Sequence, residues 1–232
     1  HPRDNTMVTG GSDKSWILWD WQEGRPLRRT TAHADQITAV GFATDGRAFA
    51  TGGEDGEIRV WNYPDATAVQ SLSGHKGGIT DLRFSPTGQL LASASKDGTV
   101  KVWDYTSGKL VYDLTGHDFI VSRIRFSPDG RALISVSRDK TVKLWDVQTG
   151  KFIRTLSGER NQIVALAVSR DGRVIATGSI AKDVSLMAYP LRVLLAEEEP
   201  PASPPPPTAQ TDQATAPTGP KEATLDPTGA AK

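Results

Sequence analysis

The sequence GHKGGITDLRFSPTGQLLASASKDGTVKVWD occupies residues 74–104, and a close copy, GHDFIVSRIRFSPDGRALISVSRDKTVKLWD, occupies residues 116–146. The copies start 42 residues apart, and the same interval relates residues of several other types along the chain. The recurring sets are Trp19, Trp61, Trp103 and Trp145; His33, His75 and His117; and Phe42, Phe84 and Phe126. Because unrelated residue types obey one period, the sequence predicts an array of structural repeats.

Each period reads as four short strands separated by turns. In the copy that begins at Gly74, apolar residues and the breaks between them predict strands over 79–85, 90–95, 99–104 and 109–114. The dipeptide Asp97-Gly98 precedes the third of these strands, and such dipeptides supply the positive φ that tight hairpins need. Four strands in about 40 residues match one blade of a β-propeller. The sequence therefore predicts an all-β protein built from four-stranded antiparallel blades.

The motifs resemble those of the WD-repeat β-propeller family. They are Gly74-His75, Phe84-Ser85-Pro86, Ser93-Ala94-Ser95-Lys96-Asp97 and Val102-Trp103-Asp104, repeated as Gly116-His117, Phe126-Ser127-Pro128-Asp129-Gly130 and Leu144-Trp145-Asp146. The resemblance covers residues 1 to about 196. It implies a rigid ring that presents loops on one face to other proteins or peptides, without catalysis and without a cofactor.

A Ser or Thr, a His and an Asp recur in every well-formed blade, which raises the alternative of a hydrolase triad. An enzyme needs one activated nucleophile beside an oxyanion site, whereas this set occurs three times. The resemblance implies instead a structural network in which the strand Trp joins the set through hydrogen bonds. The sets so implied are His33, Thr51, Asp55 and Trp61; His75, Ser93, Asp97 and Trp103; and His117, Ser135, Asp139 and Trp145.

The two ends of the array depart from the repeat. Aligning Thr9 with Ser135 places residues 2–4 on the turn after the first strand, so that strand is missing from the first blade. In the last blade Glu159, Ala181 and Met187 stand where His, Asp and Trp are expected, and Thr177 alone remains from the network. We expect that blade to be held by burial of Ile163, Leu166, Val168, Ile175, Val184 and Leu186.

The count of repeats indicates four complete blades and most of a fifth. A seven-bladed ring with this period would need about 294 residues, and an open series would leave two blade faces uncovered. Three arrangements stay open: the C-terminal part of a larger, seven-bladed ring, which we favour; association with another copy or a partner that completes a ring; and closure into a strained small ring.

Composition narrows the class of partner. The chain has 27 basic and 27 acidic residues, and this balance gives no support to a nucleic-acid or membrane partner. It has no cysteine, which excludes disulfides and thiolate metal sites, and the three repeat histidines fall one per blade, so we expect no metal site.

Residues 190–196 are expected to form the outer strand of the last blade. Residues 197–232 are rich in Pro, Ala and Thr, and we expect a disordered tail there.

In WD-repeat proteins, partner contacts recur three and five residues after the His and directly before the Asp. Carried over by position, the predicted partner-binding residues are Gln36, Thr38, Glu54, Thr80, Lys96, Ile120, Ser122, Arg138, Gln162, Val164 and Ile180. Gly78 and Ser12 occupy two further such positions. Ile120, Val164 and Ile180, with Arg138 beside them, are expected to form an exposed apolar cluster next to a cation.

These observations predict a non-catalytic protein–protein interaction scaffold. One alternative is a regulatory or targeting propeller fused to an enzyme, such as a kinase or protease, in an N-terminal part. Another is a ligand-binding or catalytic propeller that uses its central channel. That alternative requires carboxylates or histidines that converge at channel positions, and the sequence singles out only the structural ones.

Overall fold

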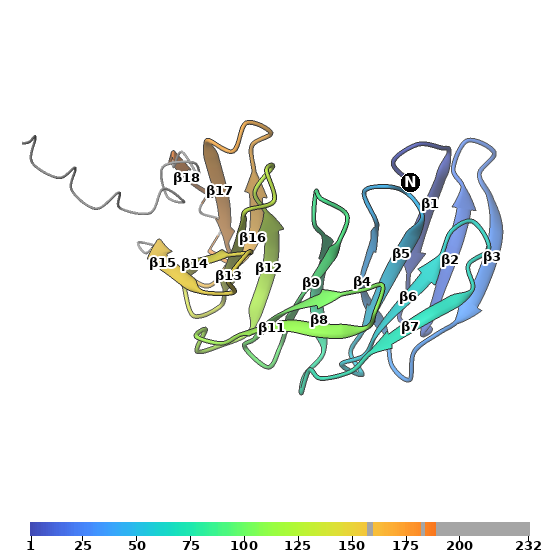
Figure 1. Cartoon of the computed structure of the whole chain (residues 1–232), viewed down its shortest axis with the longest axis horizontal. Helices are drawn as coiled ribbons and strands as arrows, with labels where there is room; N and C mark the ends of the chain where they lie inside the picture. The colour runs from blue at the N-terminus through green and yellow to red at the C-terminus, as the bar shows by residue number, and fades with distance from the viewer. Residues whose placement is uncertain (157–159, 182–183, 189–232) are drawn as a thin grey trace, which may run out of the picture. The chain divides into compact units, whose positions relative to one another are not determined.

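The structure is a computed structural model that describes residues 1–156, 160–181 and 184–188. These residues form antiparallel sheets and no helix (Figure 1). The first sheet contains β1 (Thr6–Gly10), β2 (Ser15–Asp20) and β3 (Arg25–Thr31). The second contains β4 (Ile37–Phe42), β5 (Ala48–Gly53), β6 (Ile58–Asn62) and β7 (Ala68–Leu72), and the third β8 (Ile79–Phe84), β9 (Leu90–Ser95), β10 (Val100–Asp104) and β11 (Lys109–Leu114). The fourth contains β12 (Val121–Phe126), β13 (Ala132–Ser137), β14 (Val142–Asp146) and β15 (Phe152–Leu156), and the fifth β16 (Ile163–Val168), β17 (Val174–Ser179) and β18 (Val184–Ala188).

The sheets have the topology expected of propeller blades. Within each sheet the strands follow chain order and pair antiparallel with their sequence neighbours. The first strands of the second to fifth sheets lie beside one another, β4 with β8, β8 with β12 and β12 with β16, and β1, which is equivalent to β5, lies beside β4. Within the described residues this series does not close into a ring. The predicted all-β class and blade architecture are confirmed as a partial propeller.

The strand boundaries predicted for the third sheet agree with the structure to within one residue at each end. The first sheet has three strands, as expected from the missing first strand. The predicted outer strand at 190–196 and the predicted tail at 197–232 lie outside the described residues. The boundary near residue 196 therefore stays a prediction.

The core lies between sheets rather than within them. Trp103 of the third sheet joins a buried cluster whose other members include Ala50 and Leu72 of the second sheet. On the opposite face of the third sheet, Val100 and Val102 pack in a cluster with residues of the fourth sheet. Similar clusters join the first sheet to the second and the fourth to the fifth. The second, third and fourth sheets therefore each bury one face against their predecessor and the other against their successor.

The fifth sheet corrects one expectation. Ile163, Leu166 and Ile175 are buried as predicted, and Val168 is partly buried. Val184 and Leu186 are 75% and 74% exposed, whereas Val100 and Val102 at the equivalent positions of β10 are buried. Side chains two residues apart share one face of a strand, and in the third sheet that face is covered by the next sheet. No further sheet covers it within the described residues, so the prediction of burial was wrong for these two.

One turn position offers a test of backbone strain. Gly56 and Gly98 adopt φ of +77° and +83° in the hairpin turn, and Lys140 occupies the equivalent place with φ of +72°. A side chain in this left-handed region is unfavourable by roughly 1 kcal/mol. We expect Lys140→Gly to raise the free energy of unfolding by about 0.5–1 kcal/mol in urea titrations.

The matched control is Gly98→Ala, which should lower stability. An alanine at this positive φ would be strained, and its Cβ would lie 3.2 Å from the His117 carbonyl oxygen. A Lys140→Gly variant that is no more stable than the wild type would contradict this account of the turn.

Candidate functional site

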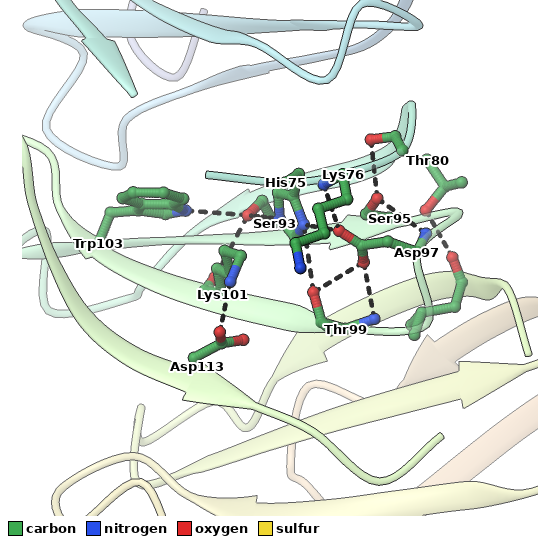
Figure 2. A network of polar contacts seen from close by, with 12 residues as sticks. His75, Lys76, Thr80, Ser93, Ser95, Asp97, Thr99, Lys101, Trp103 and Asp113 are labelled. Atoms are coloured by element: carbon green, nitrogen blue, oxygen red, sulfur yellow. Dashed lines mark hydrogen bonds and ion pairs between the residues drawn. The ribbon is translucent and has the colours of Figure 1, made fainter. Parts of the chain in front are cut away.

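The Ser, His, Asp and Trp of the third sheet form one hydrogen-bonded chain of side chains (Figure 2). Trp103 Nε1 donates to Ser93 Oγ at 2.9 Å, and Ser93 Oγ lies 2.8 Å from His75 Nε2. His75 Nδ1 lies 2.9 Å from Asp97 Oδ2. Since a carboxylate accepts the Nδ1 proton, the neutral tautomer leaves Nε2 to accept the serine proton. This assignment gives every polar atom of the chain a partner.

Asp97 also holds the turn in which it lies. Its carboxylate accepts hydrogen bonds from Lys76 N at 2.8 Å, from Thr99 N at 2.9 Å and from Thr99 Oγ1 at 2.7 Å. Lys76 belongs to the loop before β8, while Thr99 follows the hairpin turn between β9 and β10. One carboxylate thus ties together two loops at the same end of the sheet. Sequence reasoning missed Thr99, although Thr141 recurs 42 residues later and makes the same bonds to Asp139.

The second and fourth sheets repeat the arrangement. In the second, Thr51 Oγ1 lies 2.8 Å from His33 Nε2 and 3.1 Å from Trp61 Nε1, and His33 Nδ1 lies 3.1 Å from Asp55. In the fourth, Ser135 Oγ lies 2.7 Å from His117 Nε2 and 2.8 Å from Trp145 Nε1, and His117 Nδ1 lies 2.7 Å from Asp139. All twelve residues predicted for the network are therefore brought together in three sets of four.

The first sheet contains only part of the set. Trp19 Nε1 donates to Thr9 Oγ1 at 2.9 Å, but Asp13 pairs with Arg29 rather than with a histidine. Trp19 is only half-buried, and Asp13 is exposed. The first sheet thus provides a natural comparison for what the complete network contributes.

Burial decides between a structural network and a catalytic triad. Thr51, Ser93 and Ser135 each have 0% of their surface exposed. Each hydroxyl already accepts a hydrogen bond from a tryptophan indole. A nucleophile must approach a substrate carbonyl next to an oxyanion site, and these hydroxyl oxygens have no such access. The geometry therefore favours structural satisfaction of buried polar groups.

Burial also shifts the acid–base properties of the network. Burial lowers the pKa of His75 and of His117 below the ordinary value, and the hydrogen-bonded carboxylates oppose this only in part. Although burial acts to raise it, hydrogen bonds from Thr99, Lys76 and His75 lower the pKa of Asp97 to about 2. The folded network thus favours neutral imidazole and ionised carboxylate.

We therefore expect the protein to lose stability in two steps as the pH falls. The first step begins near the ordinary histidine pKa of about 6.5, because unfolded imidazoles then bind protons that the buried ones do not. The second begins near pH 4, where unfolded Asp97 is protonated while the folded carboxylate is still ionised. The loss of unfolding free energy in this second step should reach about 2 kcal/mol near pH 2.

Urea midpoints measured from pH 7 to pH 3 test this expectation. An Asp97→Asn variant, which has no carboxylate at this position, should lose less stability between pH 4 and pH 3 than the wild type. A stability that stays constant from pH 7 to pH 5 would contradict the buried neutral histidines.

Comparison with known families agrees with this geometry. A family model described as the WDR3 first beta-propeller domain matches residues 5–189. The chain belongs to the WD-repeat β-propeller family. No curated protein matches the chain. The repeated sheets are therefore WD-repeat blades.

One backbone hydrogen bond recurs at the predicted partner positions of four WD-repeat blades. In each blade the residue before the network Asp position donates to the carbonyl of the residue three places after the His position. The pairs are Glu54 to Gln36 at 2.9 Å, Lys96 to Gly78 at 2.9 Å, Arg138 to Ile120 at 3.0 Å and Ile180 to Gln162 at 3.1 Å. These pairs define a rim, which we call the loop rim, at one end of each of these blades.

The predicted positions five residues after the His are used largely within the fold. Thr38 Oγ1 donates to the Ile79 carbonyl and Thr80 Oγ1 to the Val121 carbonyl, both at 2.5 Å, so each ties one blade to the next. Ser122 is buried and its Oγ has no hydrogen-bond partner. Its burial removes Ser122 from the exposed surface that the sequence predicted.

The predicted apolar cluster is only partly exposed. Ile180 is 59% exposed, whereas Ile120 and Val164 are half-buried. Phe119, which sequence reasoning missed, is 51% exposed next to Ile120. Its place between the His and the first strand of the blade is the signal that could have identified it.

Charged residues also lie together on the first strands of the third and fourth blades, where sequence reasoning identified no candidate site. Asp81 and Arg83 of β8 lie beside Arg123 and Arg125 of β12. These charged residues alternate with apolar ones and recur 42 residues apart, and this pattern could have identified them.

Across the described residues, no three His, Cys, Asp or Glu side chains form a group that could hold a metal. The same part of the chain has no helix long and apolar enough to cross a membrane.

Proposed function

We propose that this WD-repeat chain is a non-catalytic scaffold that binds other proteins or peptides through the loop rim. The observation that supports it most is a backbone hydrogen bond that recurs in four blades. It joins two of the three kinds of predicted partner position, the one before the Asp and the one three residues after the His. A rigid frame that repeats one loop geometry presents a continuous surface whose side chains differ from blade to blade. Such surfaces suit recognition of proteins, since loops held by a rigid scaffold commonly carry binding residues.

The loop rim of the fourth and fifth blades, together with Phe119, which directly precedes Ile120, carries the side chains best suited to anchor a partner. Phe119 and Ile180 are exposed apolar residues, and Arg138 is an exposed cation whose backbone contacts Ile120. Aromatic and arginine side chains dominate the energetics of protein interfaces. On the second and third blades Glu54 and Lys96 form an ion pair, which fits the polar border of such an interface.

The buried networks support a non-catalytic role. The three sets that combine a hydroxyl, an imidazole and a carboxylate are enclosed and engage a tryptophan. They contribute to the frame and are not presented on the rim.

Affinity capture from an extract of cells that produce the protein tests the proposal. A rim variant carries Phe119→Asp and Ile180→Asp. A matched control carries Val69→Asp and Leu110→Asp, which replace two residues of similar exposure on the outer strands β7 and β11. We expect the rim variant to capture about one tenth or less of the protein that the wild type captures, because removal of an anchor commonly weakens binding by 2 kcal/mol or more.

The control variant should retain the same proteins as the wild type. Equal loss in both variants, or no loss in either, would contradict binding through the loop rim. Thermal unfolding of both variants first establishes that they are folded.

A further inference from the structure

The four charged residues on β8 and β12 form a compact cluster, which we call the inner arginine cluster: Asp81, Arg83, Arg123 and Arg125. Arg83 Nη2 lies 3.2 Å from Asp81 Oδ1, and Arg125 Nη1 lies 2.8 Å from Asp81 Oδ2. Arg123 Nη1 donates to the Thr80 carbonyl at 3.1 Å, across the same pair of strands. Both strands are edge strands of their sheets and lie side by side. The cluster is therefore built by the fold from two adjacent blades.

Asp81 is fully engaged within the protein. Besides the two guanidinium groups, its oxygens accept hydrogen bonds from Leu82 N and Ile124 N, each at 3.1 Å. Asp81 is itself buried. One carboxylate that already has four donors cannot neutralise three guanidinium groups, so the cluster has a net charge of +2.

Several donors of the cluster are left for a ligand. The hydrogen bonds of Arg123 and Arg125 to protein atoms use only the Nη1 atom of each guanidinium group. Arg83 Nε is buried and makes no hydrogen bond. This N–H is out of contact with solvent, so the donors that we consider for a ligand are the Nη2 groups of the exposed Arg123 and the half-buried Arg125.

The electrostatic environment of Arg83 agrees with excess positive charge. Burial lowers the pKa of Arg83, and the charges of Arg125 and Arg123 lower it further, while Asp81 alone acts to raise it. Three cations thus lie near enough to repel one another. An anionic ligand would relieve this repulsion.

The flanking blades carry only small residues at the positions that match the cluster. The positions equivalent to Asp81 and Arg83 are Ala39 and Gly41 on β4, and Ala165 and Ala167 on β16. None of these four residues can supply a charge or a long side chain. Ala165 and Ala167 are exposed, as is Arg123. The arginines therefore lie at a place that solvent and a small anionic group can reach.

We propose that the inner arginine cluster is a binding site for a phosphate monoester. Guanidinium groups present paired N–H donors that match phosphate oxygens, and they hold this geometry better than lysine does. A phosphate monoester carries about −1.5 to −2 charges at neutral pH, which matches the +2 charge of the cluster. A phosphorylated side chain of a peptide and a free phosphate compound share this chemistry. The site stands independently of the loop rim, because it needs only this chemical group.

Calorimetric titration of the whole chain with three probes tests the proposal. The probes are inorganic phosphate, an acetylated and amidated Gly-Ala-phosphoserine-Ala-Gly peptide, and the same peptide without the phosphate. Each is titrated into the wild type, into Arg123→Ala, and into Arg154→Ala on the outer strand of the same blade. Arg123 is chosen because it is exposed and its hydrogen bonds go to the Thr80 and Ser122 carbonyls. Thermal unfolding shows whether the variants retain the fold.

We expect at least one phosphate-bearing probe to bind the wild type with a Kd below about 1 mM, and Arg123→Ala to weaken it by about tenfold or more. Arg154→Ala should bind like the wild type, and the unphosphorylated peptide should not bind. Tighter binding of the phosphopeptide would indicate a phosphorylated side chain as the source, and equal or tighter binding of inorganic phosphate would indicate a free compound. No saturable binding, or equal loss in the two arginine variants, would overturn the proposal.

Discussion

Replacing Trp103 with alanine is expected to lower the free energy of unfolding by about 3–5 kcal/mol. The side chain is buried and belongs to the apolar cluster that joins the third blade to the second. Its removal leaves a cavity between two blades, and it also takes away the indole that donates to Ser93 Oγ. Both losses act in the same direction. Urea unfolding followed by circular dichroism measures the change.

Trp19→Ala is the matched control for Trp103→Ala. Trp19 occupies the equivalent position of the first blade and makes the same kind of bond to Thr9, but it is only half-buried. We expect a loss of about 1–2 kcal/mol, because little buried surface is removed. If the two variants lose the same stability, burial between blades is not what makes the repeated Trp important.

Replacing Asp97 with alanine is expected to lower the free energy of unfolding by about 2–3 kcal/mol. The carboxylate accepts hydrogen bonds from Lys76 N, Thr99 and His75, so its loss leaves several donors without a partner. It also removes the group that orients the His75 ring towards Ser93. The loss should show as a lower urea midpoint with an unchanged dependence on urea concentration.

Asp13→Ala is the corresponding control. Asp13 occupies the same position in the first blade, but it is exposed and pairs with Arg29 on the surface. An exposed ion pair contributes little, so we expect a loss below about 1 kcal/mol. An Asp97→Ala variant as stable as Asp13→Ala would show that the buried network contributes no more than a surface turn.

The sequence could predict the repeated parts of this molecule well. The interval of 42 residues located the strands of the third blade, because period-two alternation and Asp97-Gly98 turns are local properties. The network residues could be aligned for the same reason, since a partner such as Ser93 lies at a fixed distance from His75 in every copy. Their interpretation as structural rather than catalytic followed from the threefold repetition and the family resemblance. Their burial, which the sequence alone does not show, supports that interpretation.

Features that depend on neighbouring blades could not be predicted in this way. Val184 and Leu186 have the apolar pattern of a buried strand, yet their exposure depends on whether another sheet covers them. Asp81 and Arg125 are 44 residues apart, and their contact follows from how two edge strands lie together. The burial of Ser122 was likewise not indicated by its position in the repeat, where the equivalent Thr80 is only half-buried.

The second, third and fourth blades are each held by a buried indole that donates to the Ser or Thr of the network. Hydrogen exchange at the six tryptophan indoles, followed by nuclear magnetic resonance of the ¹⁵N-labelled protein, tests this claim most directly. We predict that the Nε1 protons of Trp61, Trp103 and Trp145 exchange at least about 100-fold more slowly than those of Trp19 and Trp21. Equally fast exchange at all five of these indoles would contradict the account.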